Sequence, residues 1–287
     1  MVELRGSQQE EVPQLQELFR LCFGDGPAYS DQFFNYFYRP EEFLVLREEG
    51  QLRAMGGLLP LTLTEPDGRQ VKAAYLYALA THPDHQGKGY ARTLLTYAHF
   101  YLRGKRDCLI TVPARPDLHP FFQTVGFAEC FPVLEGELLP PAVPPEEGQA
   151  RALDGVAYDT LRESLLAGTH HVSYGPFAGL QKRLCDLSGG SLLALELPEG
   201  PGCAAVEHWE DTAFVKELLC PPQAFSSALA LIARTVPAGH YLLRAPVRPG
   251  APDALVSRPF GMVLWYDPIA ARRWEGAGAP YLGLAFD

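Results

Sequence analysis

The chain has 287 residues, of which 47% are hydrophobic and 20% charged, and its formal net charge is −10. This length suggests about two domains of roughly 150 residues each. The acidic balance argues against nucleic acid as a partner, because the basic field that attracts phosphates is missing. No apolar run approaches the ~20 residues of a membrane span, and the N-terminus lacks the apolar core of a signal peptide. We therefore expect a cytoplasmic protein with no membrane partner.

The six cysteines are scattered along the chain without a C-x-x-C pair. This spacing indicates reduced thiols and offers no zinc site, so we expect no bound metal. The adjacent pair His170-His171 has no cysteine or carboxylate beside it, and we expect it on the surface or in a loop.

The first half of the chain alternates strands and helices. We expect strands over residues 2–5, 43–47, 51–63, 71–81, 108–112 and 127–138, and helices over residues 8–22, 30–38, 86–102 and 118–124. The helix over 86–102 carries an apolar stripe at helical spacing, which predicts one buried face. The pattern predicts an α/β domain with a mixed sheet.

A proline-rich segment then divides the chain nearly in half. Four prolines fall within residues 140–145, and such a run cannot carry a helix or a central strand. We expect a linker at about 140–148 between domains 1–140 and 149–287.

The second half repeats part of the order of the first. We expect helices over 157–166, 177–187 and 225–234, and strands over 191–197, 203–209, 212–219, 240–245, 255–266 and 281–286. The segment LITVPARP at 109–116 has a counterpart, LLRAPVRP, at 242–249. We infer a duplication, and hence a fold class of α/β (α+β) with two mixed-sheet domains in tandem.

The most informative stretch lies between the strand over 71–81 and the helix that starts near Tyr90. The connecting loop contains Pro83, Gly87 and Gly89. Backbone N–H groups at a helix N-terminus, with the positive end of the helix dipole behind them, form a site for phosphate or pyrophosphate. The spacing is not that of a P-loop, and the third glycine of a dinucleotide fingerprint is missing. In the second half, the corresponding stretch 220–226 has two prolines and no glycine, so we expect no phosphate site there.

The spacing Gln86-x-x-Gly89-x-Ala91 after an apolar strand resembles motif A of the GNAT superfamily of acyl-CoA-dependent N-acyltransferases. The segment FFQTVGF at 121–127 resembles a downstream motif of that family, in which a short helix ends in Gly-Phe. The resemblance covers roughly residues 2–138. An intact first half followed by a degenerate second half looks like the tandem arrangement of the Eis-like acetyltransferases.

The resemblance implies that acetyl-CoA is the co-substrate and that the loop binds its pyrophosphate. In the family, the end of the preceding strand pairs through its backbone with pantetheine, and one of its N–H groups polarises the thioester carbonyl. The cofactor-binding residues that follow from this resemblance are Leu79, Ala80, Thr81, Gln86, Gly87, Lys88, Gly89, Tyr90, Ala91, Arg92 and Phe122.

The sequence offers three candidate catalytic residues. Many GNAT enzymes carry a tyrosine near the sulfur where this chain has Phe122, which has no proton to give. Strand alternation puts Tyr75, Tyr77, Leu79 and Thr81 on one face, and we expect Tyr77, then Tyr75, to act as the acid. Eis-like enzymes use the final carboxylate of the chain as base, so we expect the α-carboxylate of Asp287 near the acceptor.

The leading hypothesis is an acetyl-CoA-dependent N-acetyltransferase whose amine acceptor is a small molecule or a peptide. One alternative, motivated by Phe122, is a non-catalytic acyl-CoA-binding or regulatory protein. The other is a tRNA-dependent aminoacyl transferase, since some of those are also duplicated GNAT folds. The acidic charge and the intact loop argue against this last alternative.

Overall fold

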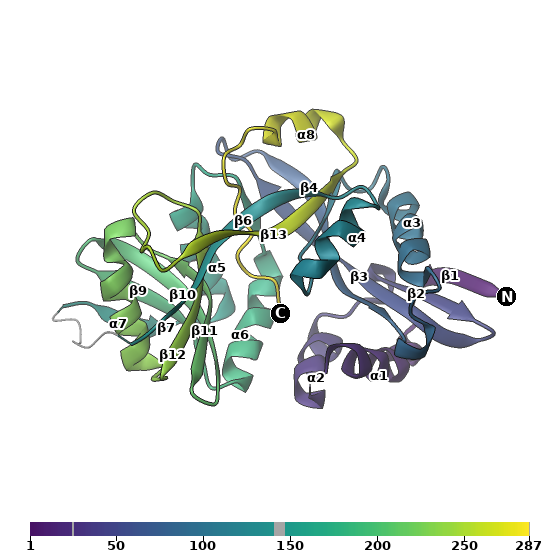
Figure 1. Cartoon of the computed structure of the whole chain (residues 1–287), viewed down its shortest axis with the longest axis horizontal. Coiled ribbons are helices and arrows are strands. Elements are labelled where there is room, and N and C mark those ends of the chain that lie inside the picture. The colour runs from purple at the N-terminus through teal and green to yellow at the C-terminus, as the bar shows by residue number, and fades with distance from the viewer. Residues whose placement is uncertain (25, 141–146, 287) are drawn as a thin grey trace. The chain divides into compact units, whose positions relative to one another are not determined.

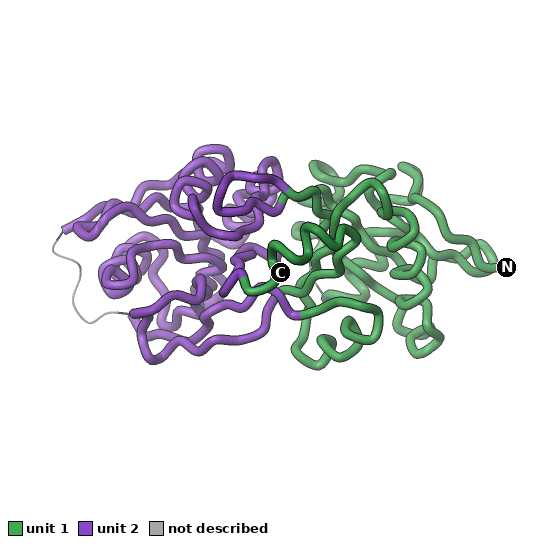
Figure 2. Tube along the Cα trace, turned by 90° about the horizontal axis from the view of Figure 1, so that it is seen from above, with its two compact units in different colours: residues 1–62, 71–128, 261–276 green, residues 63–70, 129–260, 277–287 purple. Residues whose placement is uncertain are grey.

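The computed structural model describes residues 1–24, 26–140 and 147–286 (Figure 1). The chain divides into two compact units (Figure 2). Unit 1 contains residues 1–62, 71–128 and 261–276, and unit 2 contains residues 63–70, 129–260 and 277–287. Each unit has strands and a hydrophobic core of its own, and the chain passes between the units more than once.

Unit 1 combines a sheet with helices. Its elements are, in chain order, β1 (Val2–Gly6), α1 (Val12–Phe23), α2 (Pro27–Tyr36), β2 (Phe43–Glu48), β3 (Gln51–Thr64), β4 (Gln70–Thr81), α3 (Tyr90–Leu102), β5 (Cys108–Thr111), α4 (His119–Gln123) and α8 (Pro268–Trp274). Its strands follow one another in the order β1-β2-β3-β4-β5, with β1, β2 and β3 antiparallel and β4 and β5 parallel.

Helix α3 is the crossover that the parallel pair β4 and β5 requires. Leu94, Leu95 and Ala98 of α3 share one buried core with Ala74 and Leu76 of β4. The apolar stripe of this helix is therefore the face that packs on the sheet, as the sequence predicts. The helix starts at Tyr90 rather than at residue 86, because the residues before it form the glycine-containing loop.

Strand β4 does not keep its alternation to its end. Ala78 has a left-handed φ of +52°, which is uncommon for a residue other than glycine. Beyond this position Leu79 turns to the α3 core: a Cβ placed on Gly56 would lie 3.5 Å from Leu79 and 3.6 Å from Leu76. The expectation that Leu79 shares the face of Tyr75 and Tyr77 is therefore wrong. The left-handed residue between Tyr77 and Leu79 breaks the alternation, so that Leu79 faces the opposite side of the sheet from Tyr77.

Unit 2 also combines a sheet with helices. Its elements are, in chain order, β6 (Ala128–Leu138), β7 (Gln149–Ala152), α5 (Gly155–Leu166), β8 (His171–Ser173), α6 (Ala178–Leu187), β9 (Ser191–Leu197), β10 (Gly200–Trp209), β11 (Thr212–Leu219), α7 (Phe225–Thr235), β12 (His240–Pro246) and the first part of β13 (Val256–Trp265). The strand order is β6-β12-β11-β10-β9-β7.

The two units repeat one order of elements. In unit 2, β9, β10 and β11 are antiparallel, and β11 runs parallel to β12 through the crossover helix α7. In unit 1, β4 runs parallel to β5 through α3. The α/β fold class with mixed sheets in tandem is confirmed.

The two halves of the chain exchange strands, so that each unit contains a strand from the other half. Residues 133–138 of β6 pair antiparallel with β12 in unit 2, and residues 262–265 of β13 pair antiparallel with β5 in unit 1. The predicted division at 1–140 and 149–287 therefore differs from the units, since 63–70, 129–140 and 261–276 lie in the opposite one. Prolines mark a segment without regular structure, but they do not reveal which strands pair. Residues 141–146 of the predicted linker lie outside the described residues.

Residues 281–286, which we expected to be a strand, are buried but are not part of the sheet. Their regular pairing is limited, within the described chain, to one bridge between Tyr281 and His171. The Leu282 carbonyl instead accepts hydrogen bonds from Arg162 Nη2 (2.9 Å) and the Tyr174 hydroxyl (2.8 Å), and Tyr174 also donates to the Leu284 carbonyl. Side chains thus satisfy backbone groups that a sheet would otherwise pair.

His171 also departs from expectation, because it is 2% exposed rather than at the surface. Its Nε2 lies 3.1 Å from Glu163 Oε2, a carboxylate eight residues earlier on α5. A helix followed by a short strand brings the two together, which spacing along the sequence does not show. None of the helices in the described ranges is both long enough and apolar enough to cross a bilayer.

Candidate functional site

The loop between β4 and α3 depends on two glycines. Gly87 has a φ of +75° and Gly89 a φ of +82°, conformations that favour glycine. A Cβ added to either residue would meet no atom within 4 Å. The space beside both residues is therefore open, and their backbone is accessible to a ligand.

The N-terminus of α3 presents unsatisfied donors. Gly89 is its N-cap and no side chain caps the helix. The first intrahelical hydrogen bond runs from Thr93 N to Gly89 O (2.9 Å), so the N–H groups of Tyr90, Ala91 and Arg92 have no acceptor within the helix. With the helix dipole behind them, these groups suit an anion.

Basic side chains surround this loop. Lys88 Nζ lies 3.0 Å from His85 Nδ1. Desolvation, together with the charges of Arg53 and Lys88, lowers the pKa of His85, so its ring is neutral at pH 7 and accepts a hydrogen bond from Lys88. Arg53 of β3 was not predicted. Its carbonyl accepts from His82 N (2.9 Å), and its buried Nε has no hydrogen-bond partner in the described chain.

Two of the predicted cofactor residues already have partners in the protein. Arg92 donates to the Thr124 carbonyl (3.3 Å) and to Thr124 Oγ1 (2.8 Å), which ties the first turn of α3 to the end of α4. The Tyr90 hydroxyl hydrogen-bonds the carboxylate of Glu48, and this hydrogen bond lowers the pKa of Glu48. Both contacts fix the start of α3 beside the loop.

The end of β4 extends past its parallel partner. The register with β5 runs from Ala73 to Tyr75, whereas β4 continues to Thr81. Thr111 Oγ1 of β5 donates to the Leu76 carbonyl (3.3 Å) just beyond that register. The Thr81 carbonyl accepts from Cys22 Sγ (3.4 Å), while the buried Thr81 Oγ1 has no hydrogen-bond partner among the described residues.

The predicted catalytic tyrosines lie together. Tyr75 and Tyr77 are 4% and 6% exposed, and their ring centroids are 6.5 Å apart. The Tyr77 ring also lies 4.8 Å from Phe33 of α2 and 6.2 Å from Phe19 of α1. Tyr77 thus faces the aromatic side chains of α1 and α2, on the side of β4 opposite α3. Tyr75, two residues earlier, lies on the same side of the strand.

The Gly-Phe element forms a tight turn after α4. Phe127 N donates to the Phe122 carbonyl (3.1 Å), and Gly126 has a φ of +96°. Phe122 is 5% exposed and lies in the α3 core, with its ring centroid 5.4 Å from that of Phe127. Phe122 therefore serves as a packing residue.

Comparison with known protein families gives a match over the first part of the chain. Residues 3–129 match the family model described as an acetyltransferase (GNAT) domain. Residues 3–129 belong to the GNAT superfamily. A search of curated proteins found no match.

Several solved structures resemble nearly the whole chain in fold. One is a GCN5-related N-acetyltransferase from Anabaena variabilis, with 16% identity, a TM-score of 0.67, and coverage of 93% of this chain and 73% of that one. A probable N-acyltransferase from Enterococcus faecalis has 15% identity, a TM-score of 0.69 and the same coverage. Eis1 from Mycobacterium abscessus has 15% identity, a TM-score of 0.64, and coverage of 96% and 76%. At these identities the likeness establishes the fold.

The position in unit 2 that corresponds to the GNAT loop has a different structure. Pro221 precedes a short turn over Pro222–Ala224, and α7 begins at Phe225. Proline has no N–H to offer, and no glycine lies in this stretch. The glycine-containing loop before α3 therefore has no counterpart before α7. Asp287, the third predicted catalytic residue, lies outside the described residues.

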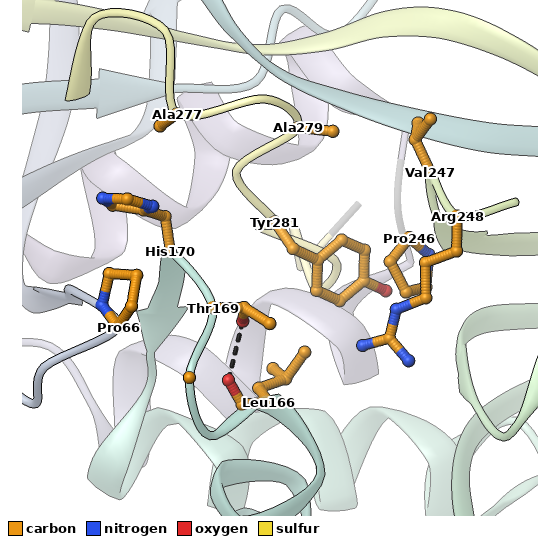
Figure 3. Close-up of a pocket in the computed structure, with 11 residues that line it drawn as sticks. Pro66, Leu166, Thr169, His170, Pro246, Val247, Arg248, Ala277, Ala279 and Tyr281 are labelled. Carbon is orange, nitrogen blue, oxygen red and sulfur yellow. Dashed lines mark hydrogen bonds between the residues drawn. The ribbon is translucent and has the colours of Figure 1, made fainter.

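Unit 2 instead contains a cavity of about 340 Å³ that the sequence did not predict (Figure 3). None of the predicted site residues that the structure describes lines it. The residues around it are Pro66, Leu166, Gly168, Thr169, His170, Pro246, Val247, Arg248, Ala277, Ala279 and Tyr281.

Proposed function

We propose that this chain is an acetyl-CoA-dependent N-acetyltransferase that acts on a primary amine. The observation that carries the proposal is the GNAT loop: two glycines with positive φ, open space beside them and an uncapped α3 N-terminus. Pyrophosphate bound there would accept from the N–H groups of residues 87–92. Lys88 adds charge, and Arg53 adds further positive potential beside the loop.

The free end of β4 suits the rest of the co-substrate. Leu79, Ala80 and Thr81 lie beyond the register with β5, so their backbone is available for pantetheine. The left-handed Ala78 is a strained residue of the kind that accumulates at functional sites. An N–H group directed at the thioester carbonyl would stabilise the oxyanion by about 3 kcal/mol.

The proposed reaction is direct attack by a neutral amine on the thioester carbon. A C–N bond forms, the oxyanion collapses, the C–S bond breaks, and coenzyme A leaves as a thiolate that must gain a proton. Tyr77 is the proposed acid, with Tyr75 second. The α-carboxylate of Asp287 is the proposed acceptor of the proton that the amine loses.

A second candidate is a GNAT-like protein that binds acyl-CoA without catalysis. The packing of Phe122 in the core favours it, because this side chain supplies no proton where many GNAT enzymes carry a tyrosine. Both candidates share the loop and differ in turnover, so binding and catalysis need separate measurements.

The binding test replaces Gly89 by Glu. A carboxylate would meet the pyrophosphate, so we expect at least a hundredfold loss of acetyl-CoA affinity, or roughly 3 kcal/mol, measured by calorimetry. Gly104→Glu is the matched control, since Gly104 has a φ of +79° and equally open surroundings outside the loop. Retained affinity in Gly89→Glu would refute the site.

The catalytic test measures release of free thiol with a panel of amines. Tyr77→Phe should lower kcat by about 10²-fold or more and leave acetyl-CoA affinity unchanged, whereas Tyr75→Phe should have the smaller effect. A glycine added after Asp287 displaces the carboxylate, and unchanged turnover would reject its role. Binding of acetyl-CoA with no thiol release from any amine would favour the non-catalytic candidate.

A further inference from the structure

The cavity in unit 2 has the features of a small-molecule site. Its lining is divided evenly between polar and apolar surface, and its volume of about 340 Å³ falls within the range of ligand pockets. Figure 3 shows the Tyr281 ring within this set of residues and the Arg248 side chain reaching down past it from the end of β12.

Arg248 is a half-buried cation without a counterion among the described residues. It forms no hydrogen bond and no ion pair with the described residues, in a chain whose acidic side chains outnumber its basic ones by 34 to 24. The nearby hairpin acids are already engaged, because Glu65 lies 3.7 Å and Asp67 lies 3.4 Å from the guanidinium of Arg69. A partly desolvated guanidinium favours an anionic partner.

The internal duplication shows which partner is missing. Arg115 of the first repeat holds the position of Arg248 in the motifs PARP and PVRP. Arg115 donates two hydrogen bonds of 3.1 Å to Asp117, one from Nε to Oδ1 and one from Nη2 to Oδ2. Gly250 stands in the second repeat where the first has Asp117. The second repeat therefore has the arginine without the carboxylate that pairs with it in the first.

The Tyr281 side chain lines the cavity, but its hydroxyl is buried on the side of Gly283, where an added Cβ would lie 2.8 Å from this oxygen. Burial raises the pKa of Tyr281 well above its usual value, so the hydroxyl keeps its proton. Its backbone is fixed on both sides, since Tyr281 N donates to the His170 carbonyl and its own carbonyl accepts from Val172 N, each at 2.9 Å.

We propose that this cavity binds a small organic carboxylate, whose two oxygens take the place on Arg248 that the Asp117 side chain has on Arg115. A carboxylate matches the planar fork of a guanidinium, and the apolar walls formed by Leu166, Pro246 and Val247 accept a short hydrocarbon body.

The test uses butyrate as the probe and the full chain as the protein. Calorimetry and thermal unfolding at constant ionic strength should show saturable binding with one site and a Kd on the order of 1 mM. Butyramide, which has the same shape without the charge, and inorganic phosphate should bind at least tenfold more weakly. Acetyl-CoA binding serves as an independent check that every variant is folded.

The decisive variants are a matched pair. Gly250→Asp restores the internal counterion and should weaken butyrate binding at least tenfold, whereas Gly250→Asn has the same shape and should leave it unchanged. Both side chains tolerate the φ of +82° at this position. Arg248→Gln should abolish binding.

Three results would each overturn the proposal. The first is an equal response to butyrate and butyramide, or a phosphate affinity equal to that for butyrate. The second is equal binding in Gly250→Asp and Gly250→Asn. The third is unchanged binding in Arg248→Gln, which also decides the matter if Gly250→Asp does not fold.

Discussion

Ala78 shows how one residue shapes a site in this chain. A left-handed conformation costs an L-residue about 1–2 kcal/mol, so its neighbours must hold it in place. The result is that Tyr77 and Leu79, two positions apart on one strand, face opposite layers. The strand can therefore present tyrosines towards α1 and α2 and still pack against α3.

Glu11 shows how a single carboxylate ties two strands to the start of α1. It accepts 2.8 and 2.9 Å hydrogen bonds from Arg5 of β1 and a 2.7 Å hydrogen bond from Arg47 of β2. The Gln8 backbone N–H donates to it at 2.8 Å. The carboxylate is 6% exposed, so these contacts are shielded from water.

Replacing Glu11 by Gln should cost about 2 kcal/mol of unfolding free energy at pH 7. Hydrogen bonding from Arg5 lowers the pKa of Glu11 in the folded state. The stabilisation is thus complete above the unfolded pKa of roughly 4.3 and is lost as the pH falls through the lower folded value. Urea unfolding at several pH values should show the two proteins converging in acid. A difference that persists unchanged at low pH would contradict this account.

At the scale of elements, the segment over residues 281–286 shows how an irregular chain is held. Arg162 is fully buried and pairs with Glu217 at 2.9 Å, while its Nη2 holds the Leu282 carbonyl. Gly283 has a φ of +81°, and a Cβ there would collide with the Glu217 carboxylate. Buried side chains of α5 and β11 therefore determine the course of this segment.

Gly283→Ala should destabilise unit 2 by more than about 2 kcal/mol, because the new methyl group must displace a buried, ion-paired carboxylate. Gly168→Ala is the matched control, since Gly168 has a similar φ of +77° but open space around its Cα. Chemical unfolding of both variants measures the difference. Equal losses would mean that backbone strain alone, without the clash at Glu217, accounts for the effect.

At the scale of the molecule, the two units share one order of elements but differ at the start of the crossover helix. Unit 1 keeps the glycine loop and an uncapped helix, whereas unit 2 has prolines at that position and a separate cavity. The strand exchange makes each unit depend on both halves of the chain, because β6 completes unit 2 and the end of β13 completes unit 1.

We expect one acetyl-CoA per chain. Titration calorimetry should give a stoichiometry of one, and Gly89→Glu should reduce it to none, since the prolines before α7 remove N–H donors from the second position. Two equivalent sites per chain would contradict this reading of unit 2.

The sequence by itself determined what depends on local order. Apolar periodicity located most of the longer strands and helices, including α3, because burial of one face imposes its period on the chain, whereas β7, β8 and α8 were not predicted. Glycines at 87 and 89 followed by a helix predicted a loop with open backbone donors at the start of α3, because donors at a helix N-terminus need no distant partner. The repeat of LITVPARP in the second half likewise indicated duplication.

Only the tertiary structure decided what depends on residues far apart in the sequence. The exchange of β6 and β13, the burial of His171 against Glu163, and the side-chain contacts along 281–286 all join segments that no local pattern connects. The reversal at Ala78 belongs here too, because surrounding contacts stabilise a conformation that the residue itself disfavours. The lack of an ion-pair partner for Arg248 in the described part of the chain became visible only beside the paired Arg115, since an ion pair depends on geometry and not on the presence of a charge.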